Sequence, residues 1–152
     1  MSVSEPLRVL FLCSGNYYRS RFAEELFNHL APGAGVAYRG DSAGLWPECH
    51  THNVGPMSPH TIRGLKERGV SLPAVLRAPR DVSEADLQGA QLTIAVKESE
   101  HRPIIERRFP DWLQRVEFWH VDDVGDAPPD VALPLIERGV RELLERLSTN
   151  AR

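Results

Sequence analysis

The stretch VLFLCSGNYYRS, residues 9–20, places a thiol, a glycine-containing turn and an arginine close together. An apolar run ends on Cys13, and the turn that follows leads to Arg19 and Ser20. The N–H groups of such a turn and the N-terminus of a following helix together form a binding site for an anion. The pattern therefore predicts a cysteine side chain held beneath a bound oxyanion.

The chemistry expected of this turn is attack on a phosphate. The forked guanidinium of Arg19 can hold two oxygens of a tetrahedral anion, and loop amides, helix dipole and arginine favour the thiolate form of Cys13. A lone cysteine ending a strand is usually a small buried hydrophobe, but a thiolate under a phosphate is a nucleophile. Cys13 and Arg19 are thus the candidate catalytic residues, and the candidate substrate-binding residues are Ser14, Gly15, Asn16, Tyr17, Tyr18 and Ser20.

Cleavage of a phosphate ester also needs a general acid that protonates the departing oxygen and later activates water. The segment WHVDDVGDAPPD, residues 119–130, follows a predicted strand. In a parallel sheet it lies on the same rim as Cys13. Asp122, Asp123 and Asp126 are its candidate acids, although a solvated turn or a cap for the last helix explains these aspartates equally well.

The elements that must position these groups alternate between strand and helix, which predicts an α/β domain with a mostly parallel sheet. Short apolar runs bounded by turn residues predict buried strands, and apolar residues at helical spacing predict amphipathic helices. A short capped helix is expected over 83–89 and an irregular loop over 45–56. The predicted strands cover 7–13, 36–44, 90–96 and 116–121, and the longer helices cover 21–30, 58–69, 99–109 and 135–147.

Length and composition indicate a soluble globular protein. The 152 residues predict one domain over 1–152, and 41% hydrophobic with 26% charged residues is ordinary for a folded domain. A net charge of −3 gives no support for a nucleic acid or an anionic membrane as partner. No apolar run approaches the ~20 residues of a membrane span, and the opening MSVSEPLR lacks the apolar region of a signal peptide. We therefore expect a cytoplasmic location.

Cysteine and histidine usage gives no indication of a metal or another cofactor. Cys13 and Cys49 are the two cysteines, which is too few to suggest a disulfide framework in an intracellular domain; a disulfide between them stays open. The histidine spacing matches no firm metal motif, and surface loops are the expected places for His50, His52, His60, His101 and His120.

The opening loop resembles that of the low-molecular-weight protein tyrosine phosphatase family, in which a strand ends in Cys, followed by a Gly-Asn pair and by Arg-Ser. DSAG, residues 41–44, resembles the end of the family's second strand. The resemblance implies a four-stranded parallel sheet flanked by helices on both faces, in three layers. It also implies a phosphocysteine intermediate on Cys13, no metal, and a phosphorylated protein or a small phosphomonoester as substrate.

The resemblance also ranks the candidate acids. In the family the acid is an aspartate followed by proline, just past the end of the fourth strand. Counting from Trp119, Asp123 occupies that place and Val124 replaces the proline, so Asp123 ranks ahead of Asp122 and Asp126.

The remaining roles follow as hypotheses. Ser20 is expected to hydrogen-bond the sulfur of Cys13, and Asn16 with Ser42 to hold the strained backbone of the loop. Tyr18 stands where many members of the family carry a second cysteine. The aromatic residues that follow the family's acid are missing, so the candidates for the substrate wall are Tyr17, Tyr18, Trp46 and Trp119.

Two other functions stay open at this point. A non-catalytic anion-binding or regulatory module on the same fold is compatible with the altered acid segment. Arsenate reduction is disfavoured, because it needs further cysteines to relay a disulfide and no cysteine pair occurs downstream of Cys49.

Overall fold

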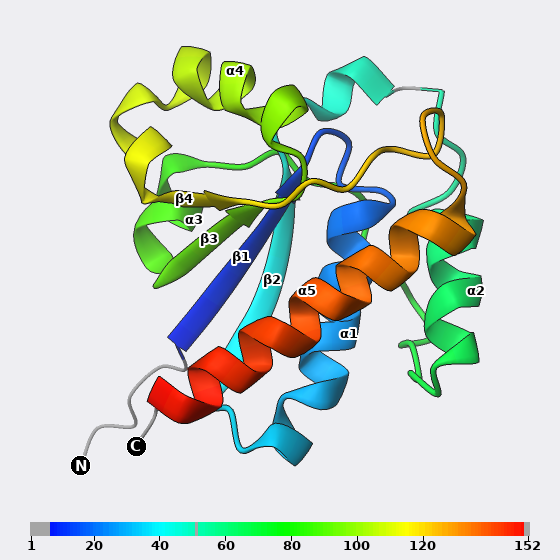
Figure 1. The fold of residues 1–152 in the computed structure, drawn as a ribbon. Helices are drawn as coiled ribbons and strands as arrows, with labels where there is room; N and C mark the ends of the chain where they lie inside the picture. The colour runs from blue at the N-terminus through cyan, green and yellow to red at the C-terminus, as the bar shows by residue number, and fades with distance from the viewer. Residues whose placement is uncertain (1–6, 51, 151–152) are drawn as a thin grey trace.

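The computed structural model of the protein describes residues 7–50 and 52–150 (Figure 1). One sheet has the strand order β2-β1-β3-β4, and every neighbouring pair is parallel. The predicted parallel sheet is confirmed, although three of its four strands are shorter than their apolar runs indicated. The strands are β1 (Leu7–Cys13), β2 (Tyr38–Gly44), β3 (Leu92–Ala95) and β4 (Val116–Phe118).

Helices cover both faces of the sheet, so the predicted three layers are also confirmed. One face carries α1 (Arg19–Leu30), α2 (Pro59–Glu67) and α5 (Pro129–Asn150), and the other carries α3 (Glu84–Gly89) and α4 (Glu98–Arg108) (Figure 1). Within the described ranges, no helix is both long enough and apolar enough to cross a bilayer. The 3-10 helices are η1 (Pro32–Ala34), η2 (Pro47–His50) and η3 (Pro110–Arg115).

The largest difference in bounds from the sequence prediction is at the start of α5, and a short helix also lies where none was predicted. Helix α5 begins at Pro129 rather than near residue 135, because proline is well suited to the first helical position, where its missing N–H would be unpaired anyway. The segment 45–56, predicted to be irregular, contains the short helix η2.

Strand β1 is buried on both faces, which explains why it forms a continuous apolar run. Val9 and Phe11 belong to the core that contains residues of α1 and α5. Leu10 and Leu12 belong to the second core, on the side of α3 and α4. The strand is therefore fixed from both sides, and so is the position of Cys13 at its end.

The order of the strands determines where the candidate site lies. The chain passes from β1 to β2 on one side and then crosses to β3 on the other side of β1. In parallel α/β sheets, a ligand crevice forms outside the carboxyl ends of the strands at such a reversal. Cys13 ends β1 at this point, and the segment that follows β4 reaches the same edge of the sheet (Figure 1).

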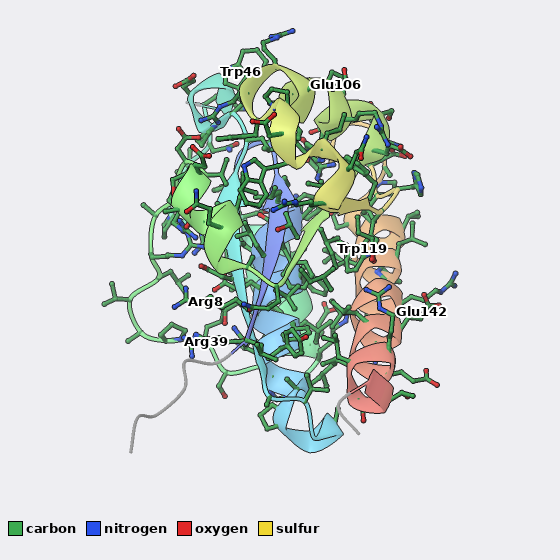
Figure 2. The ribbon with its side chains drawn as sticks, turned by 90° about the vertical axis from the view of Figure 1, so that its left-hand side faces the viewer. Arg8, Arg39, Trp46, Glu106, Trp119 and Glu142 are labelled. Carbon is green, nitrogen blue, oxygen red and sulfur yellow. The ribbon has the colours of Figure 1, made fainter. Side chains whose placement is uncertain are left out.

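Trp119 holds the start of that segment against the body of the protein. Its ring centroid lies 5.8 Å from that of Phe11, and a Cβ added to Gly139 of α5 would lie 2.9 Å from two of its ring atoms. Figure 2 shows Trp119 beside α5, whereas Trp46 lies at the top of the view, away from Trp119. Trp119 is therefore a packing residue between sheet and helix.

Gly44, the last residue of β2, allows the loop after Cys13 to pass close by. A Cβ at this position would lie 2.8 Å from the carbonyl oxygen of Ser14 and 3.2 Å from Cβ of Asn16. The backbone of the loop cannot move away without losing its hydrogen bonds to the residues just after β2, which include Trp46 N–H to the Ser14 carbonyl at 2.9 Å.

We expect Gly44→Ala to lower the free energy of unfolding by about 1–3 kcal/mol, as overpacking of a tight site does. Gly33→Ala is the matched control, because a Cβ there meets nothing within 4 Å, and its effect should stay within about 0.5 kcal/mol. Urea denaturation of both variants measures the difference. Equal stability of the two variants would contradict the packing described for Gly44.

Candidate active site

The loop between β1 and α1 leaves its own backbone donors unused. Across residues 7–50 and 52–150, the N–H groups of residues 14–18 donate to no acceptor in the protein. Buried backbone N–H groups are nearly always paired, and Ser14 and Tyr18 are 4% and 5% exposed. Five consecutive unpaired donors therefore form a concentrated site for an oxyanion.

Asn16 holds this loop in its conformation. Its φ of 51° is the one positive φ among the described non-glycine residues. The side-chain Nδ2 donates to Oγ of Ser20 and to Oγ of Ser42, both at 2.9 Å. Oδ1 accepts from Nη1 of Arg77 at 2.9 Å and from the backbone N–H of Arg80 at 3.1 Å. All four hydrogen-bonding positions of the amide are used, which offsets the strain of the left-handed backbone.

Arg77 extends the support of Asn16 to β2 and α1. Its Nη2 donates to the carbonyl oxygen and to Oγ of Ser42, at 3.0 and 2.9 Å, and pairs with Glu24 at 3.0 Å. Ser42 in turn donates to Glu24. This partly buried group of charged and polar side chains, on the side of the loop away from the cavity, fixes the orientation of Asn16.

Ser20 connects Asn16 to the thiol. Its Oγ lies 2.9 Å from Sγ of Cys13, and Cys13 is 3% exposed. Because Ser20 Oγ accepts from Asn16, its own proton is free to be donated to the sulfur.

Arg19 is buried, at 2% exposed, and part of its donor set is already used. Nη1 donates to the carbonyl of Val121 at 2.9 Å and to Oε1 of Glu100 at 3.2 Å, and Nη2 donates to Oε2 of Glu100 at 2.8 Å. A guanidinium has five N–H donors, so Nε–H and the second N–H of Nη2 remain. These two donors lie on one edge of the group and suit two oxygens of one anion.

Glu100 and His101 on α4 hold Arg19 and the start of the loop together. Ser14 donates to Oε2 of Glu100. Nδ1 of the fully buried His101 accepts from the backbone N–H of Lys97 at 3.1 Å, so the proton of a neutral imidazole is on Nε2. Nε2 lies 3.0 Å from Oε2 of Glu100 and 3.1 Å from Oγ of Ser14. The imidazole therefore donates toward the carboxylate that holds Arg19.

The charges of this cluster follow from burial and pairing. Burial opposes ionisation of Glu100, but hydrogen bonds from His101 and Arg19 outweigh it and hold the pKa of Glu100 well below its usual range. Burial lowers the pKa of His101 more than Glu100 raises it. For Arg19, burial is outweighed by Glu100 and other nearby acidic groups, so its pKa is raised. At neutral pH the cluster is an ion pair with a neutral histidine.

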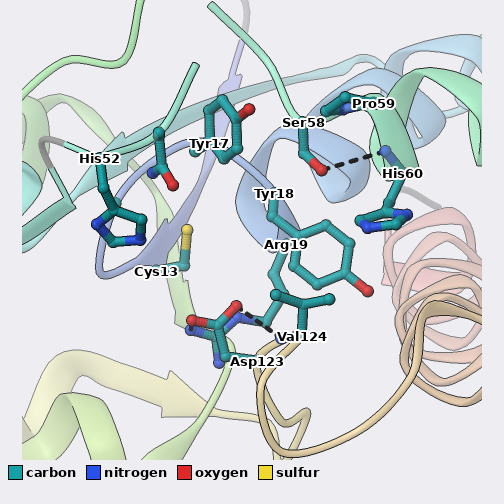
Figure 3. Close-up of a pocket in the computed structure, with 12 residues that line it drawn as sticks. Cys13, Tyr17, Tyr18, Arg19, His52, Ser58, Pro59, His60, Asp123 and Val124 are labelled. Carbon is teal, nitrogen blue, oxygen red and sulfur yellow. Dashed lines mark hydrogen bonds and ion pairs between the residues drawn. The ribbon is translucent and has the colours of Figure 1, made fainter. Parts of the chain in front are cut away.

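A cavity of about 310 Å³ opens over the thiol and contains one of the three candidate acids. Asp123 lines it, with Oδ2 at 3.7 Å from Nη2 of Arg19 and Oδ1 accepting the N–H of Val124 at 2.8 Å (Figure 3). Asp122 instead pairs with Lys97 at 2.5 Å. The cavity is lined by Cys13, Gly15, Tyr17, Tyr18, Arg19, His52, Asn53, Ser58, Pro59, His60, Asp123 and Val124.

The structure thus brings most of the predicted site residues together and places others elsewhere. Tyr17 and Tyr18 line the cavity, whereas Trp46 and Trp119 do not. The surface-loop interpretation of His101 is wrong, because its side chain is buried within α4. The side chain of Cys49 lies outside the described residues. In the part of the chain that the structure describes, no group of three or more His, Cys, Asp or Glu could hold a metal ion.

Sequence reasoning missed Glu100, His101 and Arg77 as parts of the site. Each contacts the loop from more than 60 positions away in the chain. The pair Glu100-His101 on a predicted helix with a charged first turn gave no distinctive signal, and Arg77 lies in a segment without regular structure. Their roles depend on the fold and are not visible in local spacing.

A parallel α/β sheet with a cysteine under unpaired amides, and with an arginine and a carboxylate on the same cavity, is suited to phosphate chemistry that depends on a cysteine. Comparison with known proteins gives the family. Residues 8–152 match the low molecular weight phosphotyrosine protein phosphatase family. The chain belongs to this family.

Two curated relatives come from Bacillus subtilis (strain 168). A protein-arginine-phosphatase is 29% identical over 108 residues, which are 71% of this chain and 67% of that protein. The low molecular weight protein-tyrosine-phosphatase YfkJ is 36% identical over 94 residues, which are 59% of this chain and 56% of that protein.

Solved structures show the same fold. A low molecular weight protein tyrosine phosphatase from T. tengcongensis has a TM-score of 0.73 at 27% identity, covering 95% of this chain and 99% of the other. The structure of YfkJ from Bacillus subtilis has a TM-score of 0.82 at 23% identity, covering 99% and 100%. At that identity, the second likeness shows the fold alone.

The ion pair between Glu100 and Arg19 predicts that the free energy of unfolding falls at acid pH. A carboxyl whose pKa is lowered by folding contributes stability that is present above its unfolded pKa, about 4.3, and is lost as pH falls below it. We expect Glu100→Gln to lower the free energy of unfolding by about 1–3 kcal/mol at pH 7 and to flatten its decline between about pH 5 and pH 3.

Glu106→Gln is the control for this prediction, because Glu106 is exposed on the same helix. Urea denaturation at several pH values measures both variants. A Glu100→Gln variant whose stability falls with acid as steeply as that of the wild type would contradict the proposed state of Glu100.

Proposed function

We propose that this protein hydrolyses phosphate esters on proteins through a phosphocysteine intermediate on Cys13. The observation that carries the proposal is the run of unpaired N–H groups over residues 14–18, with the Cys13 sulfur at the start of the loop. Membership of the family supports phosphatase activity.

In the first step, the thiolate of Cys13 attacks phosphorus and an S–P bond forms as the ester P–O bond breaks. The loop amides and the free edge of Arg19 bind the nonbridging oxygens, whose charge is stabilised in the transition state. Asp123 gives its proton to the departing oxygen, so that the leaving group departs as an alcohol or a phenol.

In the second step, water attacks the phosphocysteine and the S–P bond breaks. Asp123, now a carboxylate, accepts a proton from that water. The hydroxyl of Ser20, 2.9 Å from the sulfur, stabilises the thiolate as it leaves. Glu100 stays ionised and keeps Arg19 oriented in both steps.

The substrate proposed is a phosphorylated protein side chain, with an aryl ester favoured. Tyr17 and Tyr18 form an aromatic wall of the cavity, and the hydroxyl of Tyr17 donates to the carbonyl of Val54 at 2.5 Å, which holds the ring in place. One curated relative is named a protein-arginine-phosphatase, so a phosphoarginine side chain is the second candidate; there the bond that breaks is P–N, and the proton from Asp123 goes to the departing nitrogen. Turnover of phosphotyrosine and phosphoarginine peptides at equal concentration decides between them.

Replacing the nucleophile tests the proposal most simply. Cys13→Ser should abolish turnover of p-nitrophenyl phosphate, because an alcohol in this site lacks the reactivity of a thiolate. The variant should still bind inorganic phosphate, and the shift in its thermal unfolding midpoint on addition of phosphate measures this binding. Residual turnover near the wild-type rate would contradict the role of Cys13. Phosphate binding by the wild type without any turnover would indicate a non-catalytic anion-binding module instead.

Replacing each candidate aspartate in turn tests which one is the general acid. Asp123→Asn should lower kcat by about 10²–10³-fold, with a larger loss for phenyl phosphate than for p-nitrophenyl phosphate, because the poorer leaving group depends more on a proton. Asp122→Asn and Asp126→Asn should cost far less. If Asp122→Asn or Asp126→Asn shows the larger, leaving-group-dependent loss, the acid is that residue and not Asp123.

A further inference from the structure

Tyr18 occupies a fixed position between the anion-binding loop and α2. Its carbonyl accepts from the N–H of Phe22 at 3.1 Å and from Oγ1 of Thr61 at 2.9 Å. Its ring packs edge-on against His60, with the ring centroids 6.2 Å apart. The side chain is 5% exposed and belongs to the hydrophobic core. The direction of its hydroxyl is therefore set by packing.

That hydroxyl is left without a partner in the part of the chain that the structure describes. Among the described residues, the oxygen of Tyr18 is buried and makes no hydrogen bond. A buried donor left unpaired is unfavourable and calls for an explanation. Its neighbours differ in this respect, since Ser14 and Asn16 in the same loop and Ser20 at the start of α1 all have side-chain partners.

The hydroxyl is a donor throughout the neutral pH range. Burial and the nearby charge of Asp123 raise the pKa of Tyr18 to about 12, so the proton stays on the oxygen. A group that pairs with it must therefore supply an acceptor atom.

The cavity indicates where such a group would come from. Tyr18 lines the same cavity as Cys13, together with Ser58, Pro59 and His60 at the start of α2. In Figure 3 the ring lies between Arg19 and His60, and its hydroxyl points away from Cys13. The hydroxyl is thus turned away from the place where a phosphate over the thiol would lie, so the partner we expect for it is the group that carries the phosphate.

We propose that Tyr18 is a specificity-determining residue whose hydroxyl donates a hydrogen bond to an acceptor oxygen on the leaving group of the substrate, on its side remote from the phosphate. The inference rests on the proposed function and narrows its substrate class. Substrates with a carboxylate or carbonyl at that place are favoured over equally sized ones that lack it.

Two aryl phosphates and the variant Tyr18→Phe test this. Phenyl phosphate has no acceptor opposite its phosphate, whereas 4-carboxyphenyl phosphate has a carboxylate there. We expect Tyr18→Phe to lower the ratio of kcat/KM for the carboxylated substrate to that for phenyl phosphate by about three- to tenfold, the usual range for one hydrogen bond. Differences in the intrinsic reactivity of the two esters cancel when the ratios of the variant and the wild type are compared.

The control is Tyr38→Phe, on β2 and outside this cavity, which should leave the ratio unchanged. The thermal unfolding midpoint of Tyr18→Phe should equal or exceed that of the wild type, because no hydrogen bond of the free protein is lost. An unchanged ratio, or a variant that is markedly less stable or fails to fold, would overturn the inference. A wild type that hydrolyses neither ester would overturn the proposed function and this inference with it.

Discussion

A loop in which five consecutive amide groups find no acceptor within residues 7–50 and 52–150 has to be held open by contacts made elsewhere, and this constraint organises the structure around it. Left to itself, the backbone of residues 14–18 would turn its N–H groups toward local acceptors. Asn16 prevents this with four side-chain hydrogen bonds. Gly44 gives the loop room to lie against β2. The contacts that stabilise the loop are thus on the side of β2 and Arg77, and the side that faces the cavity is available to an anion.

The guanidinium of Arg19 is divided in the same way, with one edge bound to the protein and the other available to an anion. Arg19 uses one edge of its guanidinium on Glu100 and on the carbonyl of Val121, so the edge left for phosphate is held in a defined orientation. Preorganised donors of this kind need little rearrangement as charge develops in the transition state. Because Val121 lies two residues before Asp123, Arg19 also connects the phosphate site to the segment that carries the proposed acid.

The fold and the nucleophile loop were predictable because their signals are local. The buried strand β1 gives a continuous apolar run, and Cys13, Arg19 and Ser20 lie within eight positions of one another. The contacts that complete the site are not local: Glu100 and Arg77 meet the loop through the topology of the sheet. The residue types alone also do not show whether Asp122 or Asp123 is the acid. The two carboxylates are adjacent in the chain and differ in the structure, where Asp123 lines the cavity and Asp122 pairs with Lys97.

We infer that the loop after β1 binds a tetrahedral oxyanion directly above the sulfur of Cys13. A crystal structure of the protein with tungstate tests it most directly. We expect the anion over Sγ, with its oxygens bound by the N–H groups of residues 14–18 and by Nε and Nη2 of Arg19, and with Asp123 on the open side. An anion bound elsewhere, or a loop whose amides point away from the sulfur, would contradict it.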